Sequence, residues 1–242
     1  MAGLHLIAAL SRLSKWGLTR KLVSHNPAAG ITKDHHHTPR DRVLNHDEIK
    51  RFCSACDAVG WPAGPIFKLL LLTGQREVEI GSMCWSELDL DKRQLNLPGS
   101  RTENGKAHTV HLSDMALAVI ERLPRIDGCD YVFGTTARGP FRSYKSNRQR
   151  IQTLMGAETP EFVTDDLRRT ATALMAELGI APHVAGKVLN HTGGSIRDLG
   201  AVHNRFQHLA ERKAALDALG RFVADLIGRD EGNVMPLRAT AE

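Results

Sequence analysis

Two arginines carry the clearest chemical signal in this sequence. Arg76 lies within Thr73–Glu79, and Arg168 lies within Asp166–Thr170. Attack on a phosphodiester places extra negative charge on its non-bridging oxygens, and a planar guanidinium binds two such oxygens through parallel hydrogen bonds. Two arginines can therefore neutralise a phosphate without a metal ion. If the fold brings these two together, they form a phosphate-binding site.

Breaking and rejoining a phosphodiester at such a site also needs a nucleophile and a proton donor. A tyrosine can attack, because its aryl phosphate ester conserves the energy of the broken bond, and a lysine or histidine can protonate the departing 5′ oxygen. The tyrosines of this chain are Tyr131 and Tyr144, and both precede Arg168. The sequence therefore supplies two phosphate-binding arginines but no tyrosine after them.

Five short motifs, in order over roughly residues 10–225, resemble those of the tyrosine recombinases, the phage-type integrases. The motif around Arg76 resembles the first arginine box of that family, and the motif around Arg168 resembles the second. The others resemble its leucine-x-histidine motif, its interdomain linker and the end of its DNA-gripping core-binding domain. In the order given, the motifs are Thr73–Ile80 with Met83–Leu90, Asp166–Ala171, Val188–His191, Arg40–Leu44 and His25–Gly30.

The resemblance assigns roles to four residues. It implies that Arg76 and Arg168 clamp the scissile phosphate, that His191 hydrogen-bonds it, and that Glu79 orients the local structure without reacting. The alternative is that the two arginines are surface charges or ion-pair partners, which is the usual situation of arginines in proteins.

The sequence departs from the family pattern at two supporting positions. Glu103 stands where the family has a lysine on its β-hairpin, and a carboxylate there repels a phosphate. Lys106, across the turn, is a substitute only if a three-residue displacement leaves its side chain pointing the same way. Asp165 stands where the second arginine box has a histidine, and it donates a hydrogen bond only when protonated.

The third departure is at the nucleophile, because His203 occupies the position of the family's tyrosine. Histidine forms phosphoramidates in other enzymes, so a histidine recombinase remains one hypothesis. The simpler one is an N-terminally truncated family member whose catalysis is impaired. Three function classes therefore stay open: a strand-breaking enzyme, a module that binds DNA without cutting it, and an interaction remnant with no DNA affinity.

The elements that must position these residues are mostly helical, with a small antiparallel sheet, an α+β class. Asn45 and Glu48 predict a capped helix, and Asn104-Gly105 predicts a hairpin turn between the last two of the short strands within 84–112. Ser113 and Thr164 are expected helix caps, and Pro182 suits a first helical turn. The expected helices span 46–59, 65–73, 113–123, 141–155, 164–178, 182–189 and 203–225.

Changes in composition along the chain predict four segments. Residues 1–25 are expected to form a remnant helix of a core-binding domain, stopped by Pro27, and 26–42 a linker. The catalytic domain is expected over 43–227, and a disordered tail over 228–242.

Charge and composition favour a polyanionic partner, double-stranded DNA. The formal net charge is +5, and no apolar run is long enough for a membrane span. A cytoplasmic location is expected from the four irregularly spaced cysteines and from the lack of a secretory signal. The expected DNA contacts are basic residues outside the arginine pair: Arg40, Arg42, Lys106, Lys145, Arg148 and Arg169.

Neither a metal ion nor another cofactor is expected. Cys53 and Cys56 form a C-x-x-C near three histidines at 35–37, but their helical spacing with Ile49 and Phe52 makes them small core residues. No second pair completes a tetrahedral zinc site. The last expected helix has an apolar stripe that either docks on another recombinase subunit or packs on its own core, and the sequence does not separate these alternatives.

Overall fold

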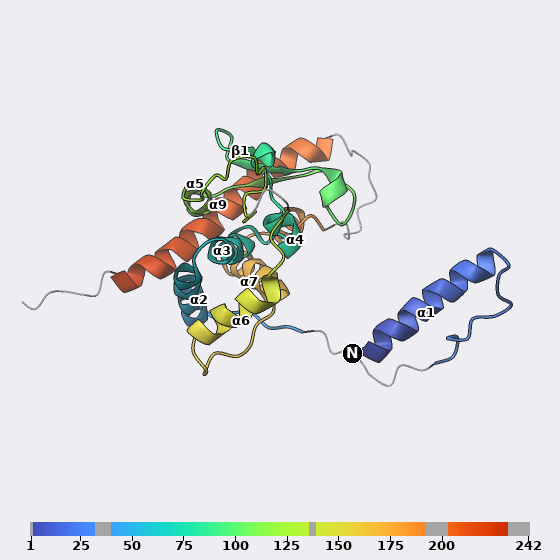
Figure 1. The fold of residues 1–242 in the computed structure, drawn as a ribbon. Coiled ribbons are helices and arrows are strands. Elements are labelled where there is room, and N and C mark those ends of the chain that lie inside the picture. The colour runs from blue at the N-terminus through green and yellow to red at the C-terminus, as the bar shows by residue number, and fades with distance from the viewer. Residues whose placement is uncertain (1, 32–39, 136–138, 192–202, 232–242) are drawn as a thin grey trace, which may run out of the picture. The chain divides into compact units, whose positions relative to one another are not determined.

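The computed structural model describes residues 2–31, 40–135, 139–191 and 203–231. The chain divides into two compact units, Met1–Arg40 and Asp41–Glu242 (Figure 1). The expected linker, 26–42, crosses this division, and its residues 32–39 are outside the described part of the chain. No helix in the described residues is both long enough and apolar enough to cross a membrane.

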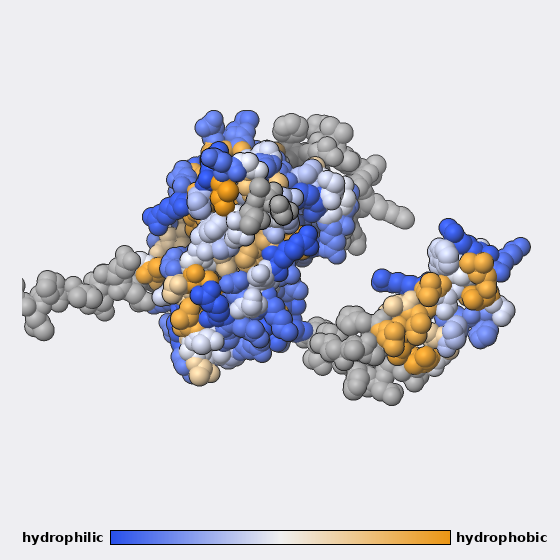
Figure 2. Space-filling model, in the orientation of Figure 1, coloured by the Kyte–Doolittle hydropathy of each residue, from blue (hydrophilic) through white to orange (hydrophobic). Residues whose placement is uncertain are grey.

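The first unit is built on a single helix, α1 (Ala2–Thr19). The helix ends well before Pro27, so the expectation that a proline stops it at about residue 25 is wrong. Lys21 adopts a positive φ of 56°, and the N–H of Leu22 donates to the carbonyl oxygen of Gly17 at 2.9 Å, which closes the last turn. Large apolar side chains on α1 are exposed within this unit (Figure 2): Leu6, Leu10, Leu13, Trp16 and Leu18.

Helix α3 (Ala63–Thr73) forms the centre of the second unit. It contacts α2 (His46–Val59), α5 (Asp114–Glu121), α7 (Thr164–Glu177) and α9 (His203–Glu231). Because α3 is surrounded, apolar residues occupy all its faces, and nine of its eleven residues are buried. Burying each leucine there contributes roughly 1.5–3 kcal/mol. Gly74, with a φ of 64°, ends α3 and turns the chain toward Arg76.

Capping residues fix where the surrounding helices begin. The expected capping box at Asn45 and Glu48 is confirmed, since Glu48 N donates to Asn45 Oδ1 and Asn45 N donates to Glu48 Oε2. Ser113 caps α5 as expected. The expectation for Thr164 is wrong, because the N–H of Val163 donates to Asp166 Oδ2 at 2.8 Å and Thr164 is the first helical residue. The side chain of Asp166 therefore fixes where α7 begins, two residues before Arg168.

The sheet has three short antiparallel strands in the order β1 (Leu88–Asp89), β2 (Gln94–Leu97) and β3 (His108–His111). Leu95 pairs with Val110, and both are buried. The expected hairpin turn at Asn104-Gly105 is a longer connection, residues 98–107, which begins with the 3-10 turn η2 (Gly99–Arg101). This connection contains Glu103, whose Oε2 lies 2.5 Å from Nη2 of Arg76.

The shorter helices complete the second unit. The helices expected over 141–155 and 182–189 are present with bounds shifted by up to three residues, and α4 and η1 were not expected. Their bounds are α4 (Glu77–Gly81), η1 (Trp85–Glu87), α6 (Tyr144–Leu154) and α8 (Pro182–Val188).

Helix α9 runs along the second unit and continues past the expected end at 225 to Glu231 (Figure 1). Leu216, Leu219 and Val223, from its apolar stripe, are buried in the hydrophobic core. The stripe therefore packs on its own unit. Of the expected tail, 228–231 are helical and 232–242 are outside the described residues.

Candidate active site

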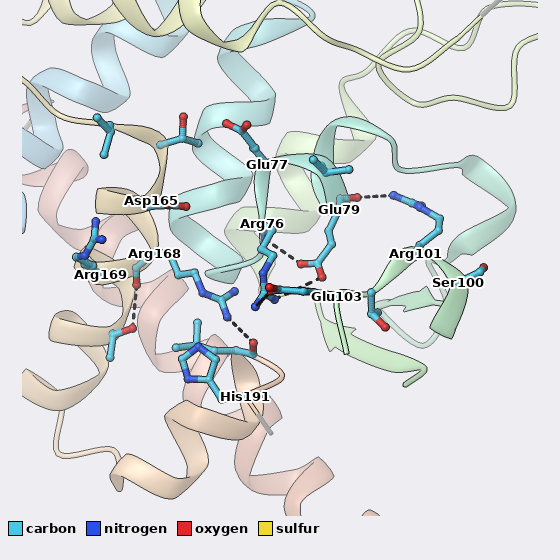
Figure 3. A pocket seen from close by; sticks show the side chains of 16 residues that line it. Arg76, Glu77, Glu79, Ser100, Arg101, Glu103, Asp165, Arg168, Arg169 and His191 are labelled. Atoms are coloured by element: carbon cyan, nitrogen blue, oxygen red, sulfur yellow. Dashed lines mark hydrogen bonds and ion pairs between the residues drawn. The ribbon is translucent and has the colours of Figure 1, made fainter. Parts of the chain in front are cut away.

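A cavity of about 870 Å³ lies where four segments of the second unit meet. The segments are the start of α4, the connection between β2 and β3, the start of α7 and the residues that follow α8. Arg76, Arg168 and His191 all line this cavity, and their side chains converge on one region (Figure 3). Glu103 and Asp165 line it too. The fold therefore brings together the five described residues that the sequence placed at one site.

Arg76 caps α4 and is held by two carboxylates. Its backbone N–H donates to Glu79 Oε2 at 2.9 Å, and its Nη1 lies 3.7 Å from Glu79 Oε1. Glu79 is 2% exposed, so it contacts Arg76 from the interior of the protein and orients it. On the open side, Nη2 of Arg76 lies 2.5 Å from Oε2 of Glu103.

Arg168 is fixed by backbone carbonyl groups. Its Nη1 donates to the oxygen of Gly74 at 2.6 Å, and its Nη2 donates to the oxygen of Leu189 at 2.5 Å. Burial, followed by the positive charge of Arg76, lowers the pKa of Arg168 to about 10. Two cations that destabilise each other gain energy when an anion binds between them.

His191 follows α8, and its N–H donates to the oxygen of Gly186 at 2.9 Å. Partial burial and the charges of Arg168 and Arg76 lower the pKa of His191, while Glu103 opposes that effect. The imidazole is therefore neutral at pH 7 and offers one N–H donor.

The charges that line the cavity balance formally. Four arginines face four carboxylates, and the two substituted positions, Glu103 and Asp165, supply half of the negative charge. The complete charged set, apart from His191, is Arg76, Arg101, Arg168, Arg169, Glu77, Glu79, Glu103 and Asp165. This balance weakens the attraction of the cavity for an anion relative to a site without those two acids.

Sequence reasoning missed several residues that shape the cavity. Asn104 Nδ2 donates to both the backbone oxygen and Oδ1 of Asn190, each at 3.0 Å, and this ties the β2–β3 connection to the residue before His191. Arg101 donates to the backbone oxygen of Glu79 at 2.7 Å and pairs with Glu87. An asparagine beside a glycine predicted a turn, and nothing in its sequence neighbourhood indicated a contact across the site.

The expected DNA contacts fall into different environments. Lys145 is exposed at the start of α6, and Lys106 is exposed outside the cavity lining. Arg169 lines the cavity and pairs with Asp166 at 2.6 Å. Arg40 is exposed in the first unit.

Two of the expected DNA contacts make close contacts within the protein. Arg148 is buried, and its guanidinium donates to the oxygen of Phe162 and to Glu161. Arg42 forms a bidentate pair with Glu48, at 2.7 and 3.0 Å. The role of Arg42 and Arg148 in DNA binding stays a prediction.

Neither tyrosine lines the cavity. The hydroxyl of Tyr144 donates to the backbone oxygen of Glu77 at 2.7 Å, and burial raises the pKa of Tyr144 to about 12. Tyr131 forms a β-bridge with Cys84. His203 begins α9, but its side chain is outside the described residues, so its relation to Arg76 and Arg168 stays a prediction.

The C-x-x-C thiols point into the core. Cys53 and Cys56 are buried, and burial raises the pKa of Cys53 to about 12. Thiols that resist ionisation are poor metal ligands. The three histidines at 35–37 are outside the described residues.

Comparison with known proteins finds similarity over the segment that contains Arg76, Arg168 and His191. The sequence model of the phage integrase family matches residues 42–201. Prophage integrase IntA of Escherichia coli K12 is 27% identical over 174 residues, covering 70% of this chain and 40% of that protein. A putative integrase/recombinase of Haemophilus influenzae is 25% identical over 213 residues, covering 83% and 53%. The chain thus spans about half the length of these relatives.

Solved structures share the fold. Lambda integrase (75–356), as a dimer bound to a COC′ core site, has a TM-score of 0.57 at 18% identity, covering 80% of this chain and 74% of that one. An integrase from mycobacterium phage Brujita has a TM-score of 0.54 at 19% identity, covering 91% and 75%. With the family model matching most of the chain, this protein belongs to the phage integrase family, the tyrosine recombinases.

Proposed function

We propose that the protein binds duplex DNA by placing one backbone phosphate between Arg76 and Arg168. The observation that carries the proposal is that both guanidinium groups line the same cavity and that the charge of Arg76 lowers the pKa of Arg168. A phosphate between them removes this repulsion and accepts hydrogen bonds from both. Neutral His191 supplies a further donor.

Three observations support DNA as the source of that phosphate. The chain belongs to a family of integrases, and solved relatives include a lambda integrase tetramer bound to a Holliday junction and the Tn1549 transposon integrase in complex with circular intermediate DNA. The net charge is +5. Arg142, Lys145 and Arg150 are exposed on and beside α6, where they can contact neighbouring phosphates.

We further propose that DNA cleavage is impaired. Glu103 lies against Arg76, where an incoming phosphate must compete with it, and Asp165 adds a second negative charge. A carboxylate at position 103 also cannot deliver a proton as a lysine does. His203, at the position of the family's tyrosine, is a poorer match in reach and leaving-group behaviour. The function that follows is DNA binding without efficient strand exchange.

Salt dependence and covalent capture test the two parts separately. Fluorescence anisotropy with duplex DNA should show affinity that falls steeply with salt, and Arg76→Ala should weaken binding and reduce the log–log salt slope by about 1. Arg122→Ala is the matched control, because Arg122 is exposed and does not line the cavity. A DNA affinity that changes neither with salt concentration nor on Arg76→Ala would refute the phosphate site.

The second part is tested with a nicked duplex that traps covalent protein–DNA intermediates. The substrate is selected from random sequences by binding to this protein, and the unmodified chain should form no denaturation-resistant adduct on it. An adduct that disappears in His203→Ala would overturn the impaired-enzyme proposal and establish histidine catalysis.

A further inference from the structure

Outside the cavity, three possible metal ligands converge where α8 meets α9. His183 lies in the first turn of α8, and His208 and Glu211 lie one turn apart on α9. One ligand atom from each of the three lies within 4.8 Å of the others. We propose that these residues bind a divalent transition-metal ion of the zinc class.

Helical geometry aligns two of the ligands. Residues three apart share a helix face, and Nδ1 of His208 lies 2.6 Å from Oε2 of Glu211. Such a pair alone is common on helices and needs no metal. His183 makes the difference, because it comes from another helix and its ring meets that of His208 edge to face at 5.7 Å between centroids.

The donor types suit zinc. Two imidazole nitrogens and one carboxylate oxygen form a frequent ligand set, which leaves a fourth position for water. Tetrahedral zinc bonds of about 2.0–2.2 Å place ligand atoms roughly 3.3–3.5 Å apart, so Nδ1 of His208 and Oε2 of Glu211, now at 2.6 Å, separate slightly to admit the ion. His183 is exposed and can rotate toward the ion, while Glu211 is half-exposed, so the ion has a path from solvent. Binding of the ion replaces the direct contact between His208 and Glu211.

Neighbouring contacts hold the turn of α9 that carries two of the ligands. Arg212, next to Glu211, donates to the backbone oxygen of His208 at 3.3 Å and to that of Thr109 in β3 at 3.3 Å. The turn is therefore tied to the sheet before any ion arrives. This lowers the ordering cost of binding.

An ion at this site would link two helices. It would join α8, which leads into His191, to α9, which begins at His203. An ion there stabilises the arrangement of the two helices that adjoin the candidate active site. Metal binding at these three residues is independent of DNA binding and is measured without DNA.

The test titrates metal into the full chain in which the three histidines at 35–37 are changed to Asn, because a run of three histidines offers competing ligands. Co²⁺ should bind at one equivalent with visible absorption bands, and Zn²⁺ should displace it. Zn²⁺ at about 100 times its Kd should raise Tm by about 5–10 °C. His183→Asn and Glu211→Gln should each weaken Co²⁺ binding by about 100-fold or more.

His46→Asn is the matched control. His46 is a half-exposed histidine whose Nε2 lies 3.1 Å from Glu177 Oε2 and which is not one of the three clustered ligands, so its loss should leave Co²⁺ binding unchanged. Circular dichroism checks that each variant is folded, and exposed His183 can be replaced without disturbing the buried core. No saturable binding up to about 1 mM Co²⁺, or binding that survives His183→Asn, would overturn the site.

Discussion

Nη2 of Arg76 lies 2.5 Å from Oε2 of Glu103, so a carboxylate of the chain itself occupies the open side of the first arginine. Glu103 is 71% exposed in its side chain, and an ion pair this exposed stabilises the fold by no more than about 1 kcal/mol. The pair is therefore weak enough for a DNA phosphate to displace, yet it must be broken for Arg76 to bind one.

Replacing Glu103→Gln should tighten DNA binding. The change removes a charge that both occupies Arg76 and repels the phosphate, and we expect roughly three- to tenfold higher affinity at low salt, or about 1 kcal/mol. Anisotropy titrations measure it. Asp114→Asn is the matched control, because Asp114 forms an equally short, exposed pair with Arg93 outside the cavity. Equal effects of the two changes would show only a general loss of negative charge.

Restoring the family residues should recover some cleavage. The triple change His203→Tyr, Glu103→Lys and Asp165→His returns a phenol nucleophile, a cationic proton donor and a neutral hydrogen-bond donor. We expect a covalent adduct on the nicked duplex, with none when Arg168→Ala is added. If the triple variant binds DNA but forms no adduct, the cavity lacks the geometry for the reaction, and the substitutions alone do not explain the impairment.

Acid should destabilise the second unit through His108. Burial, followed by the charge of Arg212, lowers the pKa of His108 to about 4, and its Nε2 lies 3.1 Å from the oxygen of Val188. A histidine whose pKa is depressed on folding binds more protons when unfolded. The free energy of unfolding is therefore full above about pH 6.5 and falls as pH drops toward 4.

Between pH 7 and 5 this single group should lower the free energy of unfolding by about 2 kcal/mol. Urea denaturation at the two pH values measures the loss, and His108→Gln, which can keep the hydrogen bond to Val188, should remove that part of it. The pKa of His191 is also lowered, so some acid sensitivity should remain. An unchanged pH dependence in His108→Gln would contradict the assignment.

Local signals predicted much of this structure. Asn45 with Glu48, Ser113, Gly74 and Pro182 mark helix ends because capping depends on residues within one turn. The convergence of Arg76 and Arg168 was predicted from the resemblance to a family, because no signal in the neighbouring sequence indicates it. Contacts between distant segments were beyond sequence reasoning, such as Asn104 with Asn190, which sets the path of the β2–β3 connection.

Basic residues on helices were the least predictable. Arg148 shares the buried face of α6 with Ile151, three residues on. Its guanidinium donates hydrogen bonds to Glu161 and to the backbone oxygen of Phe162. Arg148 was predicted as a DNA contact from a run of basic residues, and such a run does not indicate which face of the helix is buried. Arg42 lies in the segment before α2, and its pairing with Glu48, six residues on, was not predicted either.

A double-mutant cycle on Arg76 and Arg168 tests most directly whether they bind one phosphate together. DNA affinity is measured for Arg76→Ala, Arg168→Lys and their combination, with thermal melting to confirm folding. Two residues that share one phosphate should be coupled, with an interaction free energy of about 0.5–3 kcal/mol. Losses that add within about 0.3–0.5 kcal/mol, or a combined variant that binds DNA as well as the unmodified chain, would contradict the shared site.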